Sequence, residues 1–191
     1  MLEIKKITLI ISIGVPLILF FIIFFSIICG ESSAGSDNVT IVTKEDFGVP
    51  FEDNTVFHLS SPFGYRKDPF GSGVTKFHGG IDLGTSAGTN VLASANGIVY
   101  EVGYNPKGLG NYVYIKHETN DGVLYTAYGH MLDNSIVVET NQPISKRQKI
   151  GEVGSTGSST APHLHFMIMK NKISFNYEDL IDPYFVIYGL N

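Results

Sequence analysis

The chain beyond residue 60 consists of short runs rich in valine, isoleucine and tyrosine, and this pattern limits the fold more than any other feature. Glycine, asparagine or proline bounds most of the runs, as is typical of β-strands joined by tight turns. Asp121 and Gly122 form a hairpin-turn signal between two of them. Beyond Gly30, no stretch shows a sustained helical period with capping residues. We therefore predict a mostly-β, antiparallel domain with strands at residues 91–93, 97–102, 112–116, 122–128 and 163–169.

Residues 7–29 form an apolar run without a charged side chain. The run is about as long as the ~20 residues that a membrane-spanning helix needs, and it exceeds the ~7–15 apolar residues of a secretory signal. Lys5 and Lys6 precede it, and the polar stretch 31–38 follows it. By the positive-inside rule, we expect one transmembrane helix, with the N-terminus in the cytoplasm and the later domain outside the cell membrane.

The single cysteine, Cys29, offers an alternative anchor. It is followed by Gly30, as in a lipoprotein whose mature chain begins with a lipidated cysteine, although Ile28 stands where a small residue is expected. Either anchor would tether the domain at the outer face of the cytoplasmic membrane. A single cysteine also excludes a disulfide within one chain.

The sequence thus predicts four parts: a cytoplasmic N-terminus at 1–6, the anchor at 7–29, a linker and pre-domain segment at 30–58, and the folded domain at 59–191. Whether residues 39–58 pack on the domain or cover a cleft stays open. The formal net charge is -5. The chain therefore lacks the basic footprint of a nucleic-acid-binding protein, and we expect no nucleic-acid partner.

Two histidines, His163 and His165, lie two residues apart in a β-rich run. Residues at this spacing in a strand point to the same face, so both imidazoles would project into one site. His78 and Asp82 lie four residues apart around two glycines, whose flexibility permits a bend that brings the imidazole and the carboxylate together. Catalytic zinc takes three nitrogen or oxygen ligands and leaves a position for water, whose pKa falls toward ~7. These histidines and Asp82 therefore predict a catalytic zinc site. His130 and one histidine of the 163/165 pair remain for general acid–base catalysis.

Several strings resemble the lysostaphin-type, or M23, family of zinc metallopeptidases in their order and spacing. The strings are residues 61–66 (SPFGYR), 78–82 (HGGID), 110–117 (GNYVYIKH), 128–131 (YGHM), and 154–157 (GSTG) leading to 163–166 (HLHF).

This resemblance implies a LytM-like antiparallel β-sheet domain, similar to the duplicated hybrid motif, with a bound zinc ion. It implies that His78, Asp82 and His165 are the zinc ligands. His130 and His163 would be the catalytic pair, with the general base not assigned between them. The implied activity is endopeptidase cleavage of cross-links or stem peptides in bacterial peptidoglycan.

The resemblance has further implications outside the metal site. Asn111 would contact the substrate or the catalytic face. Secretion, conjugation or sporulation machinery would be possible partners of such a tethered hydrolase. The alternative function is a catalytically silent LytM-like scaffold or wall-binding module of an envelope-spanning complex, which the presence of all five site residues disfavours. The remaining histidines receive simpler interpretations, with His58 in solvent and His117 in a structural hydrogen bond.

Overall fold

The computed structural model describes residue 43 and residues 46–188. The predicted anchor at 7–29 lies outside the described residues, as does most of the predicted linker. Within the described ranges, no helix is long and apolar enough to cross a membrane.

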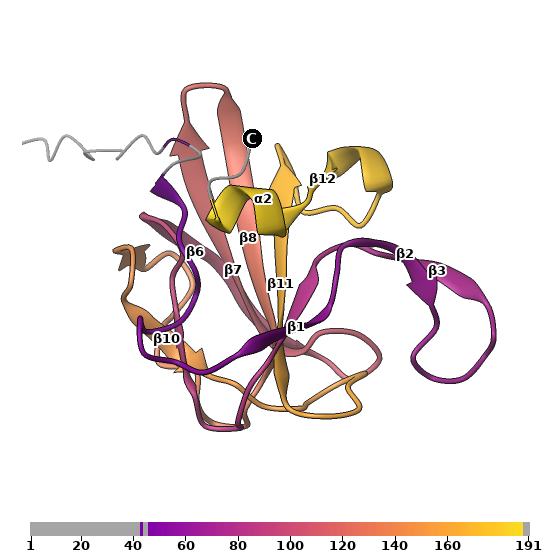
Figure 1. Cartoon of the computed structure of the whole chain (residues 1–191). Helices are drawn as coiled ribbons and strands as arrows, with labels where there is room; N and C mark the ends of the chain where they lie inside the picture. The colour runs from indigo at the N-terminus through magenta and orange to yellow at the C-terminus, as the bar shows by residue number, and fades with distance from the viewer. Residues whose placement is uncertain (1–42, 44–45, 189–191) are drawn as a thin grey trace, which may run out of the picture. The chain divides into compact units, whose positions relative to one another are not determined.

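An eight-stranded antiparallel sheet forms the body of the domain (Figure 1). Seven strands follow the order β1–β4–β11–β8–β7–β6–β9, and β12 also pairs with β11. The strands of this sheet are β1 (His58–Ser61), β4 (Ile81–Gly84), β6 (Gly97–Asn105), β7 (Gly110–Thr119), β8 (Gly122–Met131), β9 (Pro143–Ile144), β11 (His163–Lys170) and β12 (Leu180–Ile181).

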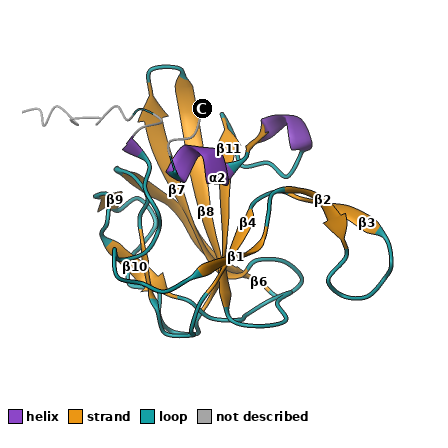
Figure 2. Ribbon diagram, in the orientation of Figure 1, coloured by secondary structure: helices purple, strands orange, loops and turns teal. Residues whose placement is uncertain are grey.

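Smaller elements surround this sheet, and the only helices among the described elements are short (Figure 2). One small sheet pairs β5 (Asn90–Leu92) with β10 (Lys149–Glu152), and another pairs β2 (Gly64–Lys67) with β3 (Thr75–His78). The β2–β3 hairpin projects to one side of the main sheet (Figure 1). A 3-10 turn, η2 (Tyr177–Asp179), and a short helix, α2 (Pro183–Ile187), follow β11.

The prediction of a mostly-β, antiparallel domain is confirmed. The five runs predicted as strands coincide with β5, β6, β7, β8 and β11. The predicted hairpin at Asp121 and Gly122 joins β7 to β8, and Gly122 takes a positive φ of 122°, which suits glycine. The other strands, all short, were not predicted: β1, β2, β3, β4, β9, β10 and β12.

The core of the domain lies on both faces of β11, which explains its nearly continuous apolar sequence. Leu164, Phe166 and Ile168 enter the larger core cluster on one face. Met167 and Met169 enter a second cluster on the opposite face. His163 and His165 point to the same face of β11 as these methionines. The first residues of this core strand therefore place two polar rings at its end.

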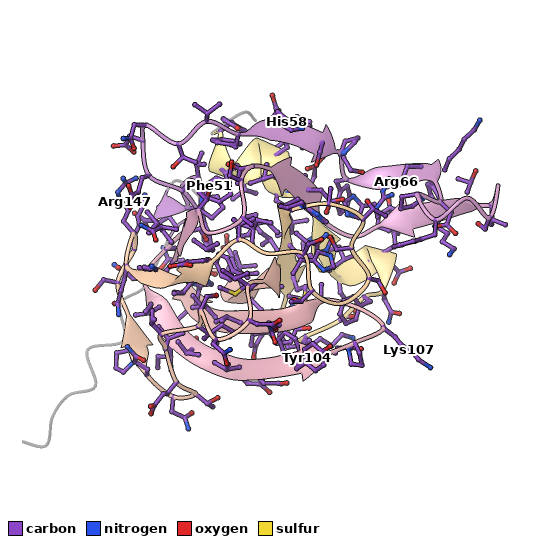
Figure 3. All side chains as sticks on the ribbon, turned by 90° about the horizontal axis from the view of Figure 1, so that it is seen from below. Phe51, His58, Arg66, Tyr104, Lys107 and Arg147 are labelled. Carbon is purple, nitrogen blue, oxygen red and sulfur yellow. The ribbon has the colours of Figure 1, made fainter. Side chains whose placement is uncertain are left out.

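The segment before β1 is part of the folded body. Phe47 and Phe51 are buried in the larger core cluster. Gly48 N donates to the Ser94 carbonyl at 2.9 Å, and Leu92 N donates to that of Pro50 at 3.0 Å. Phe51 lies on the side of the domain opposite Arg66 (Figure 3). Residues 46–57 therefore pack on the domain, the first of the two arrangements that the sequence left open.

Candidate metal centre

Strand pairing places Asp82 and His165 next to each other. The antiparallel register of β4 and β11 sets the two residues directly opposite. Side chains at such positions have Cβ atoms only ~4.5–5.5 Å apart. His165 Nδ1 lies 2.7 Å from Asp82 Oδ1, and both side chains are buried.

His78 reaches the same point from the end of β3. The turn into β4 passes so close to β11 that a Cβ on Gly80 would overlap the carbonyl oxygen of Phe166. Glycine is therefore needed here for a close approach of two backbones. This approach brings His78 Nε2 to 3.1 Å from His165 Nδ1 and 3.1 Å from Asp82 Oδ1.

The three side chains present lone pairs to one point. His78 Nδ1 lies 2.8 Å from the Pro62 carbonyl, which can only accept, so Nδ1 carries the proton and Nε2 has a free lone pair. The ligating atoms of His78, Asp82 and His165 all lie within 4.8 Å of one another. Converging lone pairs repel unless a cation lies between them, so the arrangement fits a metal ion. Two imidazole nitrogens and a carboxylate oxygen are a donor set of catalytic zinc sites.

Two more imidazoles lie beside these donors. His163 Nδ1 donates to the Ala161 carbonyl at 2.8 Å, and its Nε2 lies 3.5 Å from Asp82 Oδ1. His130 Nδ1 donates to the Thr156 carbonyl at 2.7 Å. The ring centroids of His130 and His163 are 4.7 Å apart. Backbone carbonyls thus fix the tautomers of both rings and leave each Nε2 unprotonated in the neutral form.

The backbone of His130 is strained, as is common at functional sites. Its φ is +59°, in the left-handed region that side chains other than glycine rarely adopt, at a cost of ~1–3 kcal/mol. Two hydrogen bonds stabilise this conformation. The backbone N–H of His130 donates to the Leu109 carbonyl at 2.6 Å, and its ring donates to the Thr156 carbonyl.

The electrostatics suit a cation site at neutral pH. Burial acts to raise the pKa of Asp82, but the adjacent imidazoles of His165 and His78 outweigh it and bring the pKa below its ordinary value. Burial lowers the pKa of His165, and burial with the nearby His165 ring lowers the pKa of His130 to about 4. The carboxylate is therefore charged and these two imidazoles are neutral at pH 7, as metal ligation and proton acceptance require.

The site opens into a cleft of about 710 Å³. Its lining includes the four histidines described above, together with Arg66 and His58. His58 is exposed, as predicted, but it also lines the cleft. Arg66 was not predicted as a site residue, although it ends the string at 61–66. The sequence feature that could have identified it is a single cationic residue in a motif otherwise made of small and aromatic residues.

The side chain of Asn111 forms hydrogen bonds within the domain. Its side-chain Nδ2 donates to the Met131 carbonyl at 3.2 Å and to Asp133 Oδ1 at 2.8 Å. It is not among the described residues that line the cleft. Its contact with substrate stays a prediction.

Comparison with known proteins agrees with this geometry. Residues 76–177 match the model of a family described as Peptidase family M23. The chain belongs to peptidase family M23. The matched segment contains His78, Asp82, His130, His163 and His165.

Relatives of this M23 chain include enzymes with known names. It is 38% identical over 125 residues to the DD-carboxypeptidase/endopeptidase Mpg of Neisseria meningitidis, covering 65% of this chain and 27% of Mpg. The chain spans about a quarter of the length of such curated relatives, 22% in the case of an uncharacterized metalloprotease of Haemophilus influenzae.

Solved structures share the fold of this M23 domain. The catalytic domain of lysostaphin from Staphylococcus simulans superposes with a TM-score of 0.59 at 32% identity, covering 71% of this chain and 93% of that domain. A zinc-containing peptidase from Vibrio cholerae gives a TM-score of 0.60 at 30% identity, covering 74% of this chain and 39% of that one. The resemblance to the lysostaphin-type family is confirmed.

Proposed function

We propose that this M23 domain is a zinc-dependent endopeptidase that hydrolyses cross-links or stem peptides of bacterial peptidoglycan. The observation that carries the proposal is the convergence of three metal donors next to two oriented imidazoles in an open cleft. The names of its relatives support the substrate class, because Mpg is a DD-carboxypeptidase/endopeptidase and ShyC of Vibrio cholerae is a peptidoglycan DD-endopeptidase.

The residues have separate roles in this reaction. His78, Asp82 and His165 would hold the zinc ion, which would supply Lewis-acid polarisation and activation of the attacking water near neutral pH. His130 and His163 present unprotonated Nε2 atoms to the cleft, and one of them accepts the proton of the attacking water. The protonated ring then donates to the leaving amine. The Thr156 and Ala161 carbonyls keep both rings in the tautomer that this step needs.

We further propose that residues 7–29 tether the domain at the outer face of the cytoplasmic membrane, with lipidation at Cys29 as the alternative anchor. The charge-free run after Lys5 and Lys6 supports the first. Intact mass of the membrane-extracted protein distinguishes them, because lipidation at Cys29 removes residues 1–28 and adds acyl mass.

The deciding experiment is digestion of muropeptides of known cross-link by the full chain in detergent, with mass analysis of the products. We expect cleavage of one cross-link or stem type, loss of cleavage in chelator, and recovery with added zinc. Cleavage that persists in protein shown by elemental analysis to be metal-free would refute the metal mechanism. Intact muropeptides after digestion by zinc-loaded protein would refute the substrate class.

The scaffold alternative is disfavoured because the described residues hold a complete donor set and both catalytic imidazoles. A role beside secretion, conjugation or sporulation machinery stays a prediction from the sequence.

A further inference from the structure

Arg66 brings a positive charge to the cleft from the β2–β3 hairpin. The side chain lines the cleft and comes from strand β2 of that hairpin (Figure 3). A terminal guanidinium nitrogen lies 3.7 Å from Asp82 Oδ2. The imidazoles of His78 and His165 contact the other oxygen, Oδ1. Arg66 therefore faces the Asp82 oxygen that the two imidazoles do not contact. The distance between its guanidinium nitrogen and that oxygen is too long for a hydrogen bond.

The hydrogen-bonding capacity of Arg66 is not satisfied within the domain. Its Nε is buried and has no acceptor among the described residues. The side chain as a whole is 27% exposed, so ligands can reach its outer edge. A guanidinium carries five N–H donors in a planar fork that matches a carboxylate in two parallel hydrogen bonds. The side chain thus has donors available for a planar anion in the cleft.

Charge in the cleft also favours an anion. Lys76, opposite Arg66 in the hairpin, is paired with Asp68 at 2.8 Å and points its charge there. Among the described lining residues, Arg66 is the one lysine or arginine and Asp82 the one carboxylate. Asp82 is shared between this 3.7 Å ion pair and the metal donor set, so its single charge offsets that of Arg66 only in part.

We propose that Arg66 binds a free carboxylate of the peptide substrate, on a residue next to the scissile bond. This inference rests on the proposed peptidase function and adds a selectivity: peptides with a free carboxylate there are preferred over the same peptides with a carboxamide. Stem peptides that differ only in this group are therefore distinct substrates for the enzyme.

The test compares paired muropeptides that are identical except for a carboxylate or carboxamide next to the scissile bond. We expect the full-length wild-type protein to cleave the acid with a kcat/KM about 10- to 100-fold higher than the amide, as a charge-assisted pair implies. R66Q should lower this ratio to near one by losing activity on the acid alone, and R66K should retain part of it. K67Q is the matched control, because Lys67 is an exposed cation of the same strand outside the cleft lining.

Two further readouts separate the possible failures. Zinc content by elemental analysis should be the same in R66Q as in wild type. If R66Q instead loses zinc and loses activity equally on acid and amide, Arg66 only positions Asp82 and the inference is wrong. Equal cleavage of both peptides by wild type also overturns it, while the proposed function stands. If wild type cleaves neither peptide, the proposed function fails, and the Kd values of acid and amide for the wild-type protein then decide the inference alone.

Discussion

His130 and His117 are both buried, and for each, burial is the main cause that lowers its pKa to about 4. His117 lies in the core, with Nδ1 2.7 Å from the Asn96 carbonyl and Nε2 2.9 Å from Thr126 Oγ1. Thr126 Oγ1 also lies 3.1 Å from the Tyr128 hydroxyl, and Phe47 packs its ring edge-on against the imidazole. Every polar atom of the His117 ring is satisfied.

His130 has the opposite character. Of its two ring nitrogens, only Nδ1 is hydrogen-bonded within the part of the chain that the structure describes. The centroid of its ring lies 4.7 Å from that of His163 and 5.8 Å from that of His165. The backbone strain at His130 has no counterpart at His117, which sits in a regular strand. Burial and a low pKa thus do not identify a functional histidine. A ring nitrogen left open toward a cleft does.

The largest effect expected on the cleft side is that of His165→Ala. Removing one of three donors leaves a metal site with two protein ligands, which binds zinc weakly. We expect kcat/KM to fall by at least about a thousandfold and bound zinc to be lost, since metal-assisted activation of water depends on the intact site. Elemental analysis and muropeptide digestion measure the two losses. Full activity in the variant would remove His165 from the ligand set.

His163→Ala should separate catalysis from metal binding. We expect kcat to fall ~10²–10⁴-fold, the usual contribution of an acid–base group, while zinc content stays at the wild-type level. His130→Ala should behave in the same way, so the two variants test the assignment of the whole pair. Loss of zinc from either variant would instead show that the assignment of ligands and catalytic residues is wrong.

On the core side, His117→Ala should affect stability and leave chemistry unchanged. The substitution leaves the Asn96 carbonyl without this partner, at a cost of ~1–3 kcal/mol in the free energy of unfolding, while the Thr126 hydroxyl keeps the Tyr128 hydroxyl as a partner. Urea unfolding measures the loss, and activity per folded molecule should be that of wild type. His58→Ala is the control, because an exposed side chain should change stability by no more than ~0.5 kcal/mol.

This contrast also shows what the sequence could predict. The spacing of His163 and His165 in a strand predicted that both rings lie at one site, and the family resemblance supplied the roles proposed for them. His117 was correctly predicted to be structural. Arg66 was missed because its position depends on the β2–β3 hairpin, whose four-residue strands are half exposed and carry little apolar pattern. The burial of Phe47 and Phe51 was not predicted either, because their contacts are with residues far along the chain.

The same core histidine predicts a pH dependence of stability. The folded-state pKa of His117 is about 4, below the ~6.5 of an unfolded chain, so the unfolded state binds the extra proton first as the pH falls. Its contribution to stability is therefore complete above ~6.5 and declines as the pH drops from there toward 4. We expect the zinc-free protein to lose stability over this window in urea titrations, and His117→Gln to show a smaller slope. His130 and His165, whose pKa values are also lowered by burial, remain in that variant and supply the residual slope.

The smallest effect concerns Asn111, and it distinguishes a substrate contact from a structural one. The side-chain Nδ2 of Asn111 donates to the Met131 carbonyl at 3.2 Å, which also accepts from Thr156 Oγ1 at 2.8 Å, and the Thr156 carbonyl accepts the hydrogen bond of the His130 ring. Asn111 therefore reaches the catalytic pair through the loop that orients His130. We expect Asn111→Ala to lower kcat only ~2–5-fold with KM unchanged, because a group acting through His130 alters the transition state alone. Steady-state kinetics on a cleaved muropeptide give both parameters. A raised KM with unchanged kcat would instead mean that Asn111 binds the substrate, as the sequence suggested.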